Sequence, residues 1–260
     1  MRRRAAVVAL ALVAGCARIP PPDLSLDPVR LLEQVRAAQG GVTACRGSAR
    51  LSVSSANPSG SLDAWVAAEK GGRVRVDVFD FFGNPAAVLT ASGGRFALYD
   101  AHAGVLYRGD DTPENLARLV PVPMGARDLA SVICGGAPII DGRAVSVEPG
   151  DGVLLLEIAG EPGRQVLAVG EGAAVERAAF LPGVRAGTSW KVAFSAFRRT
   201  AGHRFPGDVE LRGGGAEVSL IWKDDLEVNL PPEISLFQLD PPRGARVVDL
   251  PIHPTPSPRP

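Results

Sequence analysis

The chain of 260 residues has little of several features on which common protein classes depend. Its formal net charge is zero, with 28 basic and 28 acidic residues, whereas proteins that bind nucleic acid carry an excess of Lys and Arg. Its 3 cysteines are too few for a disulfide scaffold. No apolar run reaches the roughly 18 residues that a membrane-spanning helix needs. We therefore expect no nucleic-acid partner, no disulfide-rich domain and no helical membrane span.

Residue patterns that enzymes use are also missing. The 3 histidines form no HExxH or HxH motif, and no Cys/His cluster has the spacing of a metal site. There is no GxSxG nucleophile elbow and no P-loop lysine motif. Two adjacent acid pairs occur, Asp110-Asp111 and Asp224-Asp225, but neighbours on a strand point to opposite faces and do not easily form a catalytic dyad. We expect a protein that is not an enzyme and holds neither metal nor cofactor.

What the chain does have is the composition of a folded, strand-rich domain. Hydrophobic residues make up 46% of it and charged residues 22%, which excludes intrinsic disorder. Its 30 glycines and 23 prolines indicate many turns and hence many short strands. We expect one domain of about 220 residues with flexible ends.

The N-terminus has the layout of a secretory signal peptide. Arginines at 2–4 precede an apolar stretch at 5–13 that is too short to span a membrane. Residues 13–16 read Val-Ala-Gly-Cys, which resembles the bacterial lipobox. That resemblance implies cleavage after residue 15 and a diacylglycerol on the thiol of Cys16; the alternative is an ordinary signal peptide with an incidental cysteine. By the enterobacterial sorting rule, an Asp after the acylated cysteine retains a lipoprotein in the inner membrane. Position 17 is Ala, which implies that the protein is sorted to the outer membrane.

Loss of residues 1–15 also changes the charge balance. It removes three arginines and no acid, which leaves 25 basic against 28 acidic residues and a formal charge of −3. We therefore expect the mature protein to be held at the membrane by its acyl chains, at about 0.8 kcal/mol per buried CH₂, and not by net basic charge. Residues 16–27 would then form a proline-rich tether.

Helices are predicted at two places. Asp27 followed by Pro28 is typical of a helix start, and apolar residues at helical spacing extend the prediction over 28–39. Two shorter helices are predicted at 113–120 and 126–134, on either side of a Pro-Val-Pro sequence.

The rest of the chain has the period of two that strands show. Strands are predicted at 50–54, 62–70, 73–78, 86–91, 96–100, 104–108, 143–148, 153–159, 164–169, 175–181, 189–198, 207–212 and 216–223. Since no βαβ alternation occurs, Rossmann-like folds are excluded. A large antiparallel sheet that curls around helices fits best, with a disordered Pro-rich tail at 251–260.

Several segments follow one another in an order that a known family shares. They are 73–83 (strand into an apolar hairpin and Gly), 119–124 with 128–129 and 133–135 (Pro-linked helices closed by Gly), 189–194 with 204–211 (a Trp-Lys-Val strand and its Pro-led successor) and 216–224. Over roughly 28–229 the chain resembles the LolB family of outer-membrane lipoprotein receptors and, more broadly, the LolA/LolB superfamily.

The resemblance implies an α+β, mainly β fold for residues 28–250. It is a half-open antiparallel β-barrel of about eleven strands, with helices that cover its mouth and leave an apolar cavity. It further implies a monomer that accepts acylated lipoproteins from a LolA-like periplasmic carrier and helps to insert them into the outer membrane.

Alternation places three sets of apolar residues each on one face of a strand. A cavity and an ordinary packed core are equally good interpretations of these sets, and Trp65 and Leu98 are weaker candidates of the same kind. The sets are Val74, Val76 and Val78; Trp190, Val192 and Phe194; and Val218, Leu220 and Trp222.

Phe81 and Phe82 stand at a hairpin signalled by Gly83-Asn84-Pro85, where apolar residues are normally avoided. In the family the matching loop protrudes and presents a Leu that places lipoproteins in the membrane, and Phe82 is the matching position. A Phe ring can enter the boundary between headgroups and acyl chains. The alternative is that both rings fold back onto the sheet.

Cys45 and Cys134 leave two interpretations open. In an oxidising compartment they would pair as a disulfide, and otherwise they would be two buried free thiols.

The chain departs from LolB over 230–260, where Phe237-x-Leu-x-Pro is more like LolA and related lipoproteins. A lipid-binding or RseB-like sensing envelope lipoprotein of the same fold is therefore a second hypothesis. An interaction scaffold with a filled barrel is a third.

Overall fold

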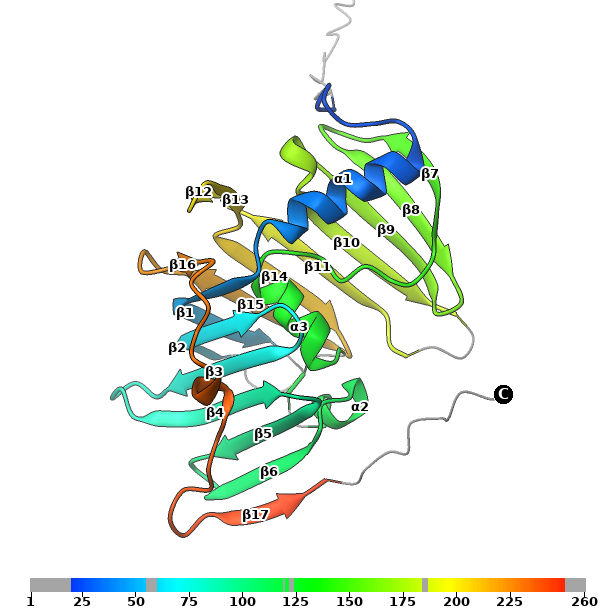
Figure 1. The fold of residues 1–260 in the computed structure, drawn as a ribbon. Helices are drawn as coiled ribbons and strands as arrows, with labels where there is room; N and C mark the ends of the chain where they lie inside the picture. The colour runs from blue at the N-terminus through cyan, green and yellow to red at the C-terminus, as the bar shows by residue number, and fades with distance from the viewer. Residues whose placement is uncertain (1–19, 55–59, 119, 122–123, 184–186, 251–260) are drawn as a thin grey trace, which may run out of the picture.

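The computed structural model describes residues 20–54, 60–118, 120–121, 124–183 and 187–250. About half of this part of the chain lies in strands, which form one large curved sheet, with a few helices on its concave side, and one small two-stranded sheet (Figure 1). The mainly β fold class is confirmed. The predicted signal peptide, Cys16 and the tail at 251–260 lie outside the described residues. Among the described residues, no helix is long and apolar enough to cross a membrane.

The strands follow the predicted order along the chain. They are β1 (Ala44–Ser54), β2 (Gly60–Glu69), β3 (Arg73–Phe79), β4 (Pro85–Ser92), β5 (Arg95–Asp100), β6 (Val105–Asp110), β7 (Arg143–Pro149), β8 (Leu154–Gly160), β9 (Gly163–Val169), β10 (Val175–Pro182), β11 (Trp190–Ser195), β12 (Arg198–Thr200), β13 (His203–Phe205), β14 (Asp208–Gly213), β15 (Ala216–Trp222), β16 (Glu227–Val228) and β17 (Arg246–Asp249).

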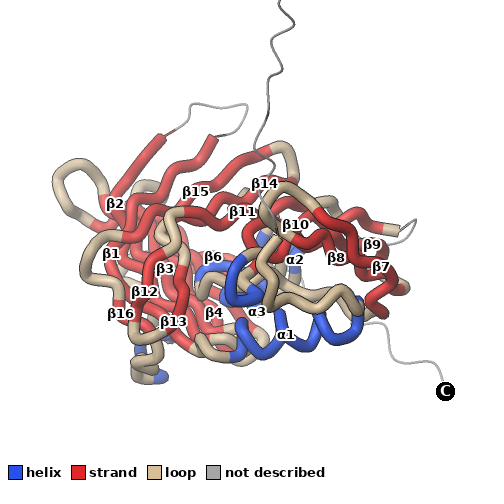
Figure 2. The backbone as a smooth tube through the Cα atoms, turned by 90° about the horizontal axis from the view of Figure 1, so that it is seen from above, coloured by secondary structure: helices blue, strands red, loops and turns tan. Residues whose placement is uncertain are grey.

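The sheet consists of two runs of mostly consecutive strands that meet where β1 pairs with β15. Its order is β17-β6-β5-β4-β3-β2-β1-β15-β14-β11-β10-β9-β8-β7, with β16 extending β15 along β1. Because β1 pairs with β15, the early strands β1–β6 and the late strands β7–β11, β14 and β15 are joined in one sheet. Its pairs are antiparallel except β17 with β6, which is parallel. In Figure 2 the strands curve around the helices, and in Figure 1 β17 and β7, the two ends of the sheet, lie apart, so the barrel is open.

Three α-helices and two short 3₁₀ helices are described. Asp27 caps the first α-helix by accepting a hydrogen bond from the Arg30 backbone N–H at 2.9 Å, as its position before a proline predicts. The third ends at Ile133, and the chain turns away two residues later at Gly135, whose φ of +73° and contact with Pro206 leave no room for a Cβ. The helices are α1 (Pro28–Gly40), α2 (Pro113–Leu116), α3 (Ala126–Ile133), η1 (Glu171–Ala173) and η2 (Ile234–Phe237).

The structure extends the sequence-based picture in three places. Seventeen strands are described instead of about eleven, partly because β12, β13, β16 and β17 have two to four residues each. The helix predicted over 113–120 ends at Leu116. The segment after residue 230 adds η2, which Arg75 holds by donating to the carbonyl of Leu236 at 2.9 Å, and then β17 at the edge of the sheet.

Candidate functional site

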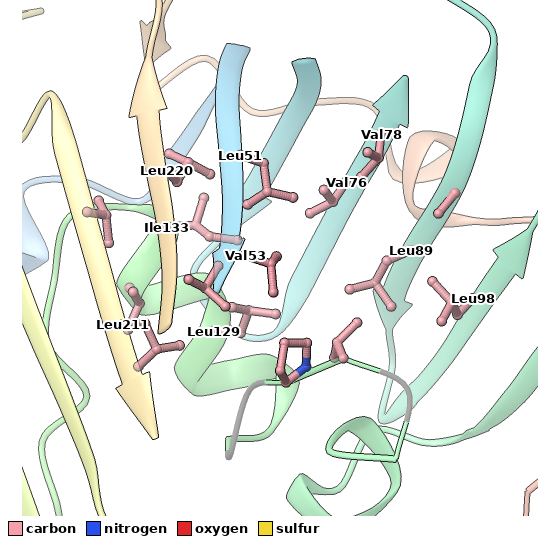
Figure 3. A pocket seen from close by; sticks show the side chains of 16 residues that line it. Leu51, Val53, Val76, Val78, Leu89, Leu98, Leu129, Ile133, Leu211 and Leu220 are labelled. Atoms are coloured by element: carbon pink, nitrogen blue, oxygen red, sulfur yellow. The ribbon is translucent and has the colours of Figure 1, made fainter. Parts of the chain in front are cut away.

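An apolar cavity of about 160 Å³ lies between the concave face of the sheet and the segment that carries α3. Figure 3 shows the side chains of the sixteen residues that line it, all of them apolar. They are Leu51, Val53, Val76, Val78, Ala87, Leu89, Leu98, Val120, Pro121, Leu129, Val132, Ile133, Val209, Leu211, Val218 and Leu220.

Strand register brings these residues together from distant parts of the sequence. Val53 lies opposite Val218 where β1 meets β15, and Leu51 lies opposite Leu220 one step along the same face. On the other side, Val76 of β3 pairs with Leu89 of β4, which in turn pairs with Leu98 of β5. The floor of the cavity is therefore a stripe of Val and Leu that runs from β14 and β15 across β1 to β3, β4 and β5.

The roof comes from the helical insertion. Leu129 and Ile133 project from α3 toward the sheet (Figure 3). Val132 lines the cavity from the same helix, and Val120 and Pro121 line it from the segment before α3. α3 contacts β2 and β3 directly. Since no lining side chain carries a charge or a hydrogen-bonding group, the cavity offers nothing for acid–base chemistry or for a polar ligand. It is suited to hydrocarbon.

The structure divides the predicted cavity residues into two groups. Val76, Val78, Val218 and Leu220 line the cavity, and so does the weaker candidate Leu98. The others do not: Val74, Trp190, Val192, Phe194 and Trp222 are buried in the core, and Trp65 is half-buried.

Aromatic neighbours occupy the space around the two buried tryptophans. The Trp190 ring lies 5.8 Å from that of Phe180, and the Trp222 ring meets Phe205 edge-on at 6.2 Å. These rings fill the core beside the cavity instead of bordering open volume.

Sequence reasoning named no residue of the roof and missed part of the floor. The alternation of Leu51 with Val53, and of Val209 with Leu211, could have pointed to the floor. The apolar face of the second inserted helix could have pointed to Leu129, Val132 and Ile133.

The Phe81-Phe82 hairpin extends from the strands that carry part of the cavity wall (Figure 1). Phe81 is 93% exposed and Phe82 84% exposed, and the two rings contact each other edge-on at 5.6 Å between centroids. The rings therefore do not fold back onto the sheet. β3 and β4, which this hairpin joins, also carry Val76, Val78 and Leu89 of the cavity.

Asp80 holds this turn in shape. Its carboxylate accepts backbone hydrogen bonds from Asn84 at 2.8 Å and Phe82 at 2.9 Å, and these bonds lower the pKa of Asp80. Gly83 follows with a φ of +81°, which a residue with a Cβ rarely adopts. The exposed rings are thus presented by an ordered turn.

Cys45 and Cys134 lie side by side in the core as free thiols, with 3.4 Å between their Sγ atoms. Cys45 is in β1 and Cys134 directly follows α3. Within the described ranges no group of three or more His, Cys, Asp or Glu side chains could hold a metal ion.

No protein-family model matches the chain, and a comparison with curated proteins likewise gives no match.

Three solved structures resemble it along most of both chains. A domain named for outer membrane lipoprotein sorting, from Vibrio parahaemolyticus, has a TM-score of 0.58 at 13% identity and covers 80% of this chain and 95% of its own. A LolA superfamily protein from Nitrosomonas europaea has a TM-score of 0.57 at 11% identity, with 82% and 99% covered. A DUF1329 family protein from Desulfovibrio piger has a TM-score of 0.55 at 14% identity, with 81% and 94% covered. The chain therefore has the fold of the LolA superfamily, whereas the narrower likeness to LolB stays a prediction.

Proposed function

We propose that the protein is an envelope lipoprotein that takes acyl chains of other lipoproteins into the cavity under α3 and helps to insert them into the outer membrane. The observation that carries this proposal is the set of sixteen apolar side chains around one cavity. Each CH₂ of an acyl chain that leaves water for such a site contributes about 0.8 kcal/mol. Binding of this kind needs no catalytic residue and no cofactor.

The size of the cavity adds a condition. Its volume of about 160 Å³ is small beside the roughly 300–1,000 Å³ of pockets that hold drug-sized ligands. An acyl chain therefore needs the roof to move away from the sheet. Leu129 at the roof and Val76, Val78 and Val218 at the floor are only partly buried, so widening here separates loosely packed groups.

The exposed Phe81-Phe82 tip supports the delivery step. Two neighbouring aromatic rings at a turn can partition into the boundary between headgroups and acyl chains. We infer that the tip brings the mouth of the cavity to the membrane surface. Since the chain carries no motif for nucleotide hydrolysis, transfer would run down a gradient of affinity, from a LolA-like periplasmic carrier to the membrane.

The proposed location rests on the N-terminal sequence. Cleavage after residue 15 and acylation of Cys16 would anchor a monomer to the periplasmic face of the outer membrane, with 16–27 as the tether.

Acyl binding can be tested with Leu129→Glu, which puts a charge into the roof of the cavity. We expect the affinity for a fluorescent long-chain fatty acid to fall at least tenfold, about 1.4 kcal/mol, because a buried carboxylate opposes an apolar ligand. Leu181→Glu is the matched control, since Leu181 is 58% exposed and lies outside the cavity lining. Equal affinities of both variants, measured by fluorescence titration, would contradict the proposed site.

Delivery can be tested with Phe82→Glu in the native cell. We expect lipoproteins to accumulate away from the outer membrane, because a carboxylate does not enter the membrane boundary, whereas Phe82→Leu should support normal sorting. Fractionation with protein levels held equal is the measurement. If depletion of the protein changes only envelope stress signalling and leaves sorting intact, the sensing hypothesis replaces the receptor hypothesis.

A further inference from the structure

The two buried thiols lie where the end of α3, which belongs to the roof of the cavity, meets the sheet that forms its floor. Cys134 follows directly after Val132 and Ile133, which line the cavity from α3, and Cys45 lies in β1, whose Leu51 and Val53 line it from the sheet. Cys45 Sγ donates to the carbonyl of Ile133 at 3.5 Å, and Cys134 Sγ donates to the carbonyl of Ala68 at 3.6 Å. The Cys45 thiol thus already contacts the last residue of α3. The Cys134 thiol contacts β2, the strand next to β1.

We propose that Cys45 and Cys134 form a disulfide that fastens the C-terminal end of α3 to β1 and so limits how far the cavity can open. The Sγ atoms, now 3.4 Å apart, must approach to about 2.05 Å, a shift on the scale of a small side-chain rotation. The effect on cavity opening rests on the proposed function, whereas the cross-link itself does not.

A polar pocket borders one of the two buried thiols. Cys134 contributes to a pocket of about 190 Å³ that Gln39, Lys70, His203 and Arg204 also line. Cys45 is enclosed, and burial, with the neighbouring Cys134, raises the pKa of its thiol well above the ordinary value. Cys134, although itself buried, is therefore the thiol that an external reagent meets when this pocket widens, and Cys45 is the one that resolves the intermediate.

The reaction balances as thiol–disulfide exchange with a disulfide donor. The Cys134 thiolate attacks one sulfur of the donor, forms a mixed disulfide and releases the donor's other sulfur as a thiol. The Cys45 thiolate then attacks Cys134 Sγ and displaces the second donor sulfur. The two cysteines lose two protons and two electrons, and the donor disulfide is reduced to two thiols.

The experiment compares two redox states of the full chain, so it does not depend on whether a variant folds. Protein reduced with dithiothreitol is divided, and one part is treated with glutathione disulfide. We expect a mass loss of about 2 Da in the treated part and a proteolytic peptide pair that joins 45 to 134, separate from any product of Cys16. Amide hydrogen exchange in α3 should slow about tenfold, and uptake of a fluorescent long-chain fatty acid should slow with it.

Cys134→Ser is the matched control, because it removes the thiol that attacks the reagent and leaves Cys45 enclosed, so treatment should change neither its α3 exchange nor its fatty-acid uptake. The absence of a 45–134 cross-link in the treated chain would overturn the proposal, and so would a cross-link that leaves α3 exchange unchanged. If α3 exchange slows on cross-linking but neither redox state binds the fatty acid, the fastening stands and the acyl-binding function fails.

Discussion

The two halves of the sheet are covered by helices in different ways. In what we call the α1 half, β7–β10, the 13-residue helix α1 places Leu31 and Val35 against β7 and β8, and Leu156 and Ile158 of β8 are fully buried. In the cavity half, β1–β6 with β14 and β15, the 8-residue helix α3 leaves Val76 and other lining residues only partly buried. One sheet therefore carries a packed core and an open apolar site.

The difference teaches that the roof, and not the sheet, decides where volume stays open. Both halves present Val and Leu on their concave faces, so the floor has the same chemistry throughout. A helix of 13 residues is about 20 Å long and one of 8 residues about 12 Å, so α3 covers less of the surface beneath it. The cavity lies where α3 and the segment before it leave the space above the floor incompletely filled.

The largest effect that separates the two halves is expected from Leu156→Ala in the α1 half. It deletes a fully buried side chain and should lower the free energy of unfolding by about 2–5 kcal/mol through lost burial and the cavity left behind. Leu98→Ala in the cavity half already borders open volume and should cost about 1 kcal/mol or less. Urea unfolding of both variants measures this, and equal losses would show that the halves are packed alike.

Enlarging a side chain should separate the halves by a smaller amount. Val169→Phe overfills the packed face of β9 and should cost about 1–3 kcal/mol. Val218→Phe points into the cavity and should change the stability by less than about 1 kcal/mol while it weakens fatty-acid binding. Unfolding curves and fatty-acid binding titrations on the same samples check both parts. If Val218→Phe binds the fatty acid with normal affinity, the cavity is not the acyl-binding site.

The fold was largely predictable from local patterns. The helix over 28–39 follows from Asp27, Pro28 and apolar spacing, and the strand of Val74, Val76 and Val78 follows from strict alternation. β16 and β17 were not predictable, because two and four residues are too few to show a period. Their partners lie far along the chain, on β1 and β6, so only tertiary contacts define them.

The candidate site was predictable as a face but not as a cavity. Alternation puts Val74 and Val76 on the same side of β3, yet Val74 is fully buried, whereas Val76 borders the open volume. Which of them is covered depends on where the roof lies, and no local pattern encodes that. The same limit applies to Trp190, whose ring packs beside that of Phe180, its partner on the neighbouring strand β10.

The smallest expected effect concerns the roof and pH. Asp128 lies in the first turn of α3, and burial raises its pKa, against a smaller opposing influence of Arg127. A raised folded-state pKa makes ionisation costly for the native state, so stability is greatest below the unfolded value and declines as pH rises through the folded pKa. Asp128→Asn removes that penalty and should stabilise the protein at pH 7, with little change at pH 3, where Asp128 is neutral in both states.

The comparison between the halves turns this into a local test. Because Asp128 belongs to α3, the gain at pH 7 should appear as slower amide exchange in α3 and leave α1 unchanged, since α1 packs on the other half of the sheet. The N-terminal position of Asp128 acts against the gain, because a carboxylate there is favoured by the helix dipole. Faster exchange in α3 of Asp128→Asn at pH 7 would mean that the dipole outweighs burial, and that ionised Asp128 steadies the roof instead of loosening it.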